Sequence, residues 1–111
     1  MPKSGKEHGE VGKQYEVDVR EKTGGQSEII DDKEIDSVTD EALIQAKDSN
    51  SAIYKPQNFL NKKTRNQIKN TIKMAAERNK HAEFWFKKEP HPDILQYIEE
   101  KGGKVIVWSK E

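Results

Sequence analysis

The last third of the chain contains the pattern that most constrains its fold: a strand, a helix and a second strand in close succession. Consecutive aromatic residues within 82–87 (Ala-Glu-Phe-Trp-Phe-Lys) predict a strand that is buried on both faces. Two prolines then break the chain before a helix over 93–101, which Gly102-Gly103 ends. Residues 104–108 (Lys-Val-Ile-Val-Trp) form a last buried strand. Because strands joined through a helix are parallel and cross over in the right-handed sense, this stretch predicts an α/β sheet.

Two periodicities compete in the segment from Val11 onward. Val11, Tyr15 and Val19 recur at helical spacing, whereas Tyr15, Val17 and Val19 alternate as in a strand. The segment ends with basic residues followed by two glycines, which is typical of the end of a helix. The sequence therefore favours a helix over 11–22.

Residues 34–48 contain two short strands with a tight turn between them, after a short strand over 27–30. We take Asp40-Glu41 as a two-residue hairpin loop. The antiparallel register then gives three directly opposed pairs: Thr39 with Ala42, Asp36 with Gln45, and Glu34 with Lys47. Opposed residues share a face, so the hairpin gathers a carboxylate, an amide and an ammonium on one side. The alternative is the solvated face of an edge hairpin.

The longest predicted helix covers 62–80 and follows a loop over 48–61 that is rich in Ser, Asn and Pro. The polar face of this helix carries Arg65, Lys69 and Lys73 at i+4 spacing, with few acidic partners. A row of unpaired cations repels itself, so this face favours a polyanionic partner such as nucleic acid. A face that only keeps the protein soluble is the alternative.

Length and composition limit the class of protein. A chain of 111 residues is long enough for one modest core, and we place a single domain at 10–111 after a flexible lead-in at 1–9. The order αβββαβαβ predicts an α/β fold with a mixed central sheet flanked by helices. Because 36% of the residues are charged and 32% are hydrophobic, we expect a thin core. Basic and acidic residues are equal at 20 each, so net charge favours neither nucleic acid nor membrane.

Several classes of site are excluded or disfavoured. The chain contains no cysteine, which excludes disulfides and thiolate metal sites, and no apolar run approaches a membrane span or a signal peptide. It contains no P-loop, GxGxxG or GxSxG motif, and its three histidines lack the HExxH spacing of a zinc site. We interpret these histidines as surface residues and the aromatic run at 84–86 as core packing.

Four segments and their order resemble a known nuclease superfamily. Asp36 followed by Gln45-Ala-Lys47, in this order of elements, is similar to the PD-(D/E)xK restriction-endonuclease-like proteins. Gly12-Lys-Gln-Tyr-Glu16, Glu34-Ile-Asp36 and Phe84-Trp-Phe further resemble nuclease toxin domains at the C-termini of bacterial polymorphic and contact-dependent growth inhibition toxins. The resemblance covers the chain from about Gly9 to Trp108.

The resemblance implies the hydrolysis of nucleic-acid phosphodiester bonds with a divalent metal ion, Mg²⁺ first, with Mn²⁺ or Zn²⁺ as alternatives. It assigns Asp36 as the central metal ligand, Gln45 as a second ligand and Glu16 as the helix-borne ligand. Lys47 takes the role of the lysine that stabilises the attacking hydroxide or the transition-state charge. Gln45 departs from the usual carboxylate, and an uncharged amide binds a hard cation more weakly. Glu34 is an alternative partner for Lys47, and Asp48 is a further carboxylate nearby.

The resemblance also implies a biological setting. The domain would be secreted as part of a larger toxin and act in the cytoplasm of a target bacterium, with a cognate immunity protein protecting the producer. The substrate is tRNA or DNA, and the small size of the domain favours RNA, tRNA above all. The alternative is a non-catalytic module that binds nucleic acid or protein on a decayed nuclease scaffold.

Overall fold

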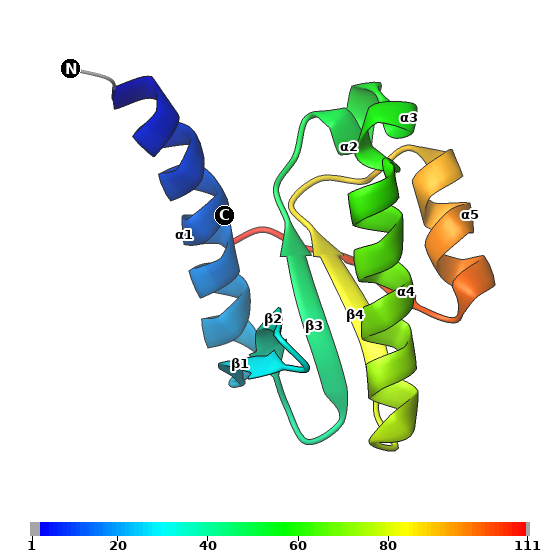
Figure 1. Ribbon diagram of the computed structural model, residues 1–111. Coiled ribbons are helices and arrows are strands. Elements are labelled where there is room, and N and C mark those ends of the chain that lie inside the picture. Colours follow the sequence, from blue (N-terminus) through cyan, green and yellow to red (C-terminus); the bar gives the residue numbers. More distant parts are fainter. Residues whose placement is uncertain (1–2, 111) are drawn as a thin grey trace.

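The computed structural model describes the backbone of residues 3–110 and the side chains of residues 13–110 (Figure 1). The major elements, in chain order, are α1 (Lys3–Thr23), β1 (Gln26–Ile30), β2 (Lys33–Val38), β3 (Ala42–Lys47), α4 (Lys62–Glu77), β4 (His81–Phe86), α5 (Pro92–Lys101) and β5 (Lys104–Val107). Two helices of one turn each, α2 (Ser51–Tyr54) and α3 (Pro56–Phe59), lie between β3 and α4.

The five strands form one mixed sheet in the order β1-β2-β3-β4-β5. The pairs β1–β2 and β2–β3 are antiparallel, whereas β3–β4 and β4–β5 are parallel. The chain passes from β3 to β4 through α2, α3 and α4, and from β4 to β5 through α5. The predicted α/β class and the parallel strands on either side of α5 are therefore confirmed.

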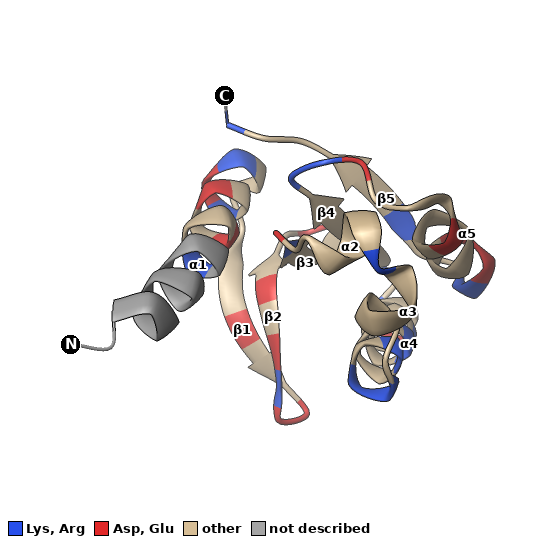
Figure 2. Ribbon diagram, turned by 90° about the horizontal axis from the view of Figure 1, so that it is seen from above, with Lys and Arg blue, Asp and Glu red and all other residues tan. Residues whose placement is uncertain are grey.

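Helices cover both faces of the sheet (Figures 1 and 2). Helix α1 packs on β2 and β3, while α4 packs on β3 and β4 and α5 packs on β5. The core is accordingly split in two by the sheet. The α1 side buries Tyr15, Val19, Ala42, Ile44, Ala46 and Trp85. The α4 and α5 side is larger, and its buried residues include Ile35, Leu43, Ile68, Phe84, Phe86, Ile94 and Ile98.

Strand β4 connects these two cores. Phe84 and Phe86 belong to the cluster under α4 and α5, and Trp85 belongs to the cluster under α1. All three side chains are buried, which confirms that the aromatic run is core packing on both faces of the sheet.

Helix α1 and the segment after β3 differ in detail from the sequence expectation. The helix is confirmed, since Tyr15 and Val19 are buried while Val17 is exposed, but it begins at Lys3. The flexible lead-in expected over residues 1–9 overlaps it from Lys3 and otherwise lies outside the described residues. The expected loop over 48–61 contains α2 and α3, where a proline starts the second helix.

The predicted hairpin register is confirmed where β2 and β3 pair. Ser37 is opposite Ile44 and Val38 is opposite Leu43, as predicted. The ladder ends there, so the predicted pairs of Asp36 with Gln45 and of Glu34 with Lys47 do not form. The Thr39 amide donates to the Ala42 carbonyl oxygen at 3.0 Å, which closes the expected two-residue loop.

Gly25 is the point of closest approach between the end of α1 and β2. A Cβ atom on Gly25 would lie 2.2 Å from Ser37 Oγ and 2.6 Å from the Val38 carbonyl oxygen. We expect Gly25→Ala to lower the free energy of unfolding by about 1–3 kcal/mol, because the strand or the helix has to shift. Chemical denaturation measures this change.

Gly24→Asn is the matched control for that substitution. Gly24 has a φ of 75°, which asparagine tolerates, and a Cβ there meets nothing within 4 Å. The control should change the free energy of unfolding by less than about 0.5 kcal/mol. Equal effects of the two substitutions would show that the close contact at Gly25 does not matter.

Candidate active site

The site begins where β2 leaves β3. If the ladder continued beyond Ser37 and Ile44, Ala46 would be opposite Ile35 and its amide would donate to the main chain of β2. Instead it donates to Asp36 Oδ2 at 2.8 Å. The main chain of Asp36 is also bound, because Arg20 Nε of α1 donates to the Asp36 carbonyl oxygen at 2.9 Å. Asp36 therefore bridges the opening between the strands with its side chain.

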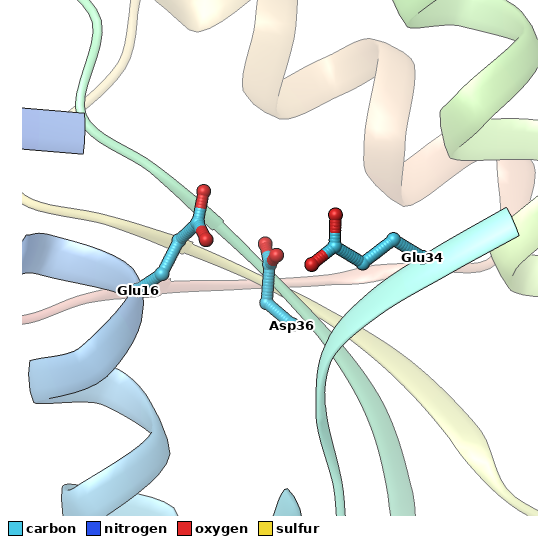
Figure 3. A group of neighbouring side chains, drawn as sticks. All are labelled: Glu16, Glu34 and Asp36. Carbon is cyan, nitrogen blue, oxygen red and sulfur yellow. The ribbon is translucent and has the colours of Figure 1, made fainter. Parts of the chain in front are cut away.

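Three carboxylates converge at this opening. Glu34 and Asp36 are two residues apart on β2 and point to the same side, and Glu16 comes from α1. One oxygen from each lies within 4.8 Å of the others (Figure 3). Tyr15 fixes the adjacent position of α1, since it is buried and its hydroxyl donates to the Trp108 carbonyl oxygen at 2.7 Å.

The pKa values of Glu16 and Asp36 are both raised. Burial raises the pKa of Glu16 most, and the charges of Asp36 and Glu34 raise it further, against the opposing effects of Arg20 and Lys47. The pKa of Asp36 is also raised, chiefly by burial and then by Glu34, although the Ala46 amide and Lys47 lower it. Gathering these negative charges is unfavourable for the protein alone.

Lys47 and Gln45 lie on the neighbouring part of β3, under α4. Burial lowers the pKa of Lys47, while the charges of Asp36 and Glu16 act in the opposite direction. Its ammonium donates to Gln67 Oε1 of α4. Gln45 is almost completely buried, and its amide nitrogen donates to the Glu34 carbonyl oxygen and to Thr71 Oγ1, both at 3.2 Å.

Residues 5–108 match the model of the family described as Restriction endonuclease fold toxin 3. The chain belongs to this family. The match includes every strand of the sheet and all the residues around the carboxylate cluster. Comparisons with curated proteins and with solved structures found no match. Among the helices in the described part of this toxin domain, none is long and apolar enough to cross a membrane.

The structure brings together most of the site residues expected from the sequence of this restriction-endonuclease-fold toxin. Glu16 and Asp36 share the carboxylate cluster, and Lys47 lies close enough for its charge to lower the pKa of both carboxylates. Gln45 is linked to the cluster through the main chain of Glu34, and both its amide hydrogens are used. Its amide oxygen is then the atom that can approach a cation, and its role as a ligand stays a prediction.

Glu34 is the acidic residue that sequence reasoning placed differently. The sequence suggests Glu34 as a partner of Lys47, whereas in the structure its carboxylate joins Glu16 and Asp36. The signal was present in the sequence, because residues at i and i+2 of a strand share a face. The expected nucleic-acid contacts Arg65, Lys69 and Lys73 are all exposed on α4, and their role also stays a prediction.

The donor set suits a hard divalent cation. Three carboxylates supply oxygen ligands without nitrogen or sulfur, which fits Mg²⁺ or Mn²⁺ better than a soft metal. Mg²⁺ usually keeps several waters and takes only a few carboxylates from the protein, so a cluster of this size is sufficient. Burial and then neighbouring negative charge raise the pKa of Glu16 and Asp36, and a bound cation would offset the negative charge.

Thermal unfolding tests this cation site directly. At about ten times its Kd, Mg²⁺ or Mn²⁺ should stabilise the domain by about 1.4 kcal/mol, a rise in Tm of roughly 5 °C. Asp36→Asn, which keeps an oxygen to accept the Ala46 amide, should abolish the rise, and Glu34→Gln should reduce it.

Two further results complete this test. Without metal, Glu34→Gln should be at least as stable as the original protein, because it removes a charge that raises the pKa of two neighbours. Glu99→Gln, an exposed change on α5, is the control and should leave the metal-induced rise intact. An undiminished rise in both Asp36→Asn and Glu34→Gln would exclude a cation at this cluster.

Proposed function

We propose that this domain is a metal-dependent endonuclease toxin that hydrolyses phosphodiester bonds of nucleic acid, with RNA, and tRNA above all, preferred over DNA. The observation that carries the proposal is the convergence of Glu16, Glu34 and Asp36 beside the ammonium of the partly buried Lys47. Membership of a restriction-endonuclease-fold toxin family supports the same reading.

Each of these residues has a separate role in the proposal. The three carboxylates, with the Gln45 amide oxygen as a further ligand, would hold the divalent ion. A bound ion supplies positive charge for the phosphate and makes hydroxide available near neutral pH. Lys47 places a fixed positive charge where negative charge develops at phosphorus. Gln67 holds the Lys47 ammonium in position, so the charge is already oriented before the substrate binds.

A cleavage assay with purified domain, total tRNA and linear plasmid tests the proposal. Activity should be lost with EDTA and return with Mg²⁺ or Mn²⁺. Asp36→Asn should lower the rate by at least about 100-fold, because it removes the central ligand. Lys47→Ala should lower it by a similar factor, the scale seen when one transition-state donor is removed, yet leave the metal-induced rise in Tm.

The cleavage assay has a control variant and results that would overturn the proposal. Lys101→Ala, an exposed lysine at the end of α5, should keep full activity. Full activity in Asp36→Asn would overturn the assignment of the site. The absence of cleavage with every metal would favour a non-catalytic binding module, and degraded plasmid with intact tRNA would reverse the substrate preference.

The basic row on α4 suggests how the domain binds nucleic acid and an immunity protein. Arg65, Lys69 and Lys73 project from the exposed side of the helix, where they would contact substrate phosphates without reading bases. An acidic immunity protein could cover the same surface in the producing cell. In this proposal the domain is secreted as part of a larger toxin and acts in the cytoplasm of the target bacterium.

Expression in bacteria tests the toxin proposal separately from the chemistry in vitro. The original domain should stop growth, and Asp36→Asn should be harmless at equal expression, because toxicity depends on hydrolysis. Coexpression of the gene that follows the toxin gene should restore growth. Equal toxicity of the two proteins would point to a mechanism other than phosphodiester hydrolysis.

A further inference from the structure

A groove lined by residues with polar side chains lies directly beside the carboxylate cluster. It has a volume of about 580 Å³ and lies between α4 and the adjoining parts of β2 and β3. Glu34 and Lys47 line the groove and also belong to the proposed active site, so the two spaces are continuous. Any substrate whose phosphate sits at the cluster would place its neighbouring group in or over this groove.

The α4 wall of the groove is lined by amides. Asn66, Gln67 and Asn70 follow one another at helical spacing, with Lys63 as the cation one turn earlier. Gln67 is bonded to Lys47, whereas the side chains of Asn66 and Asn70 make no hydrogen bond within the described residues 13–110. Two amide groups therefore face a hollow with their donors and acceptors available.

The amide wall of the groove is distinct from the basic row on α4 that the sequence predicts as a nucleic-acid contact. Arg65 and Lys69 lie on α4 as well, but they do not line the groove. In a chain where 36% of residues are charged, a wall of neutral amides is a departure from the general surface. Amides offer directed hydrogen bonds, which suit the recognition of a base edge better than the neutralisation of a phosphate.

Cations lie on both sides of the amide wall. Lys33 and Lys63 line the groove itself. On the other side of Lys47 a smaller hollow of about 130 Å³ is lined by Lys87 and Lys88. Lys47 borders both hollows, so a nucleic-acid strand could cross the site with phosphates near these lysines at either end.

We propose that the groove binds the unpaired base of a nucleotide next to the scissile phosphate, and that the Asn66 and Asn70 amides hydrogen-bond to its edge. This inference rests on the proposed nuclease function and defines its substrate as a single-stranded or looped segment of RNA. In a duplex the bases are stacked and paired away from the phosphate, so only an unstacked base can enter a hollow beside the cluster. The volume is within the range of pockets that enclose small ligands.

Binding and cleavage of one RNA hairpin test the inference independently of each other. Fluorescence anisotropy with the Asp36→Asn protein should show tighter binding of the hairpin loop than of a blunt duplex with the stem sequence. The double variant Asn66→Ala with Asn70→Ala, added to that protein, should weaken loop binding by about tenfold and leave duplex binding unchanged.

In the cleavage assay with Mg²⁺, the active protein should cut in the loop and spare the stem. Asn66→Ala with Asn70→Ala should lower kcat/KM on the preferred loop by about tenfold and relax the base preference beside the cut, while the metal-induced rise in Tm stays the same. The matched control is Gln57→Ala with Gln96→Ala, two exposed amides on α3 and α5 outside the groove, which should change nothing.

The outcomes separate the two proposals. Equal affinity for loop and duplex, equal cleavage of loop and stem, or an unchanged double variant would each overturn base recognition by the groove. Selective loop binding that depends on Asn66 and Asn70, without cleavage by the active protein in any metal, would support the groove and overturn the proposed hydrolysis.

Discussion

The hydrogen bond from the Ala46 amide to Asp36 Oδ2 is the interaction on which the candidate site depends. It satisfies a main-chain donor that would otherwise be left unpaired where β2 separates from β3, and an unpaired buried amide costs about 1–3 kcal/mol. A side chain thus replaces part of the strand ladder. Because the sheet opens there, Glu16 from the α1 face can reach groups on β2 that are close to residues under α4. A fully paired sheet would keep these two sides apart.

A second set of hydrogen bonds holds the α4 side of the opening. Gln45 joins the Glu34 main chain to Thr71, whose hydroxyl donates to the Gln67 carbonyl oxygen, while the Gln67 side chain receives the Lys47 ammonium. Residues from β2, β3 and α4 are therefore fixed relative to one another before any ligand is present. Such pre-organisation is what electrostatic catalysis requires, since charges that already point at the reacting phosphate need no reorganisation.

The hydrophobic core on the two faces of the sheet has to offset the unfavourable free energy of the carboxylate cluster. Burial and like charges raise the pKa of Glu16 and Asp36, so the cluster opposes folding when no cation is bound. The opposing contribution comes from the apolar contacts of β4, whose consecutive residues Phe84, Trp85 and Phe86 are buried alternately in the clusters on the two faces of the sheet. With only 32% hydrophobic residues, the chain places three aromatic side chains on a central strand that serves both layers.

The sequence by itself determined the elements and the local register. Period-two alternation, glycine and proline signals and the short loop at Asp40-Glu41 act between near neighbours, and they predicted the α/β class, the family resemblance and the pairing of β2 with β3. The short helices α2 and α3 were missed, because one-turn helices leave almost no periodic pattern. Strand alternation puts Glu34 and Asp36 on one face, but tertiary structure alone brought Glu34 beside Glu16 of α1 and lined the adjoining groove with amides of α4. These placements depend on where β2 leaves the sheet and how α1 and α4 pack on it, which are contacts between residues far apart in the chain.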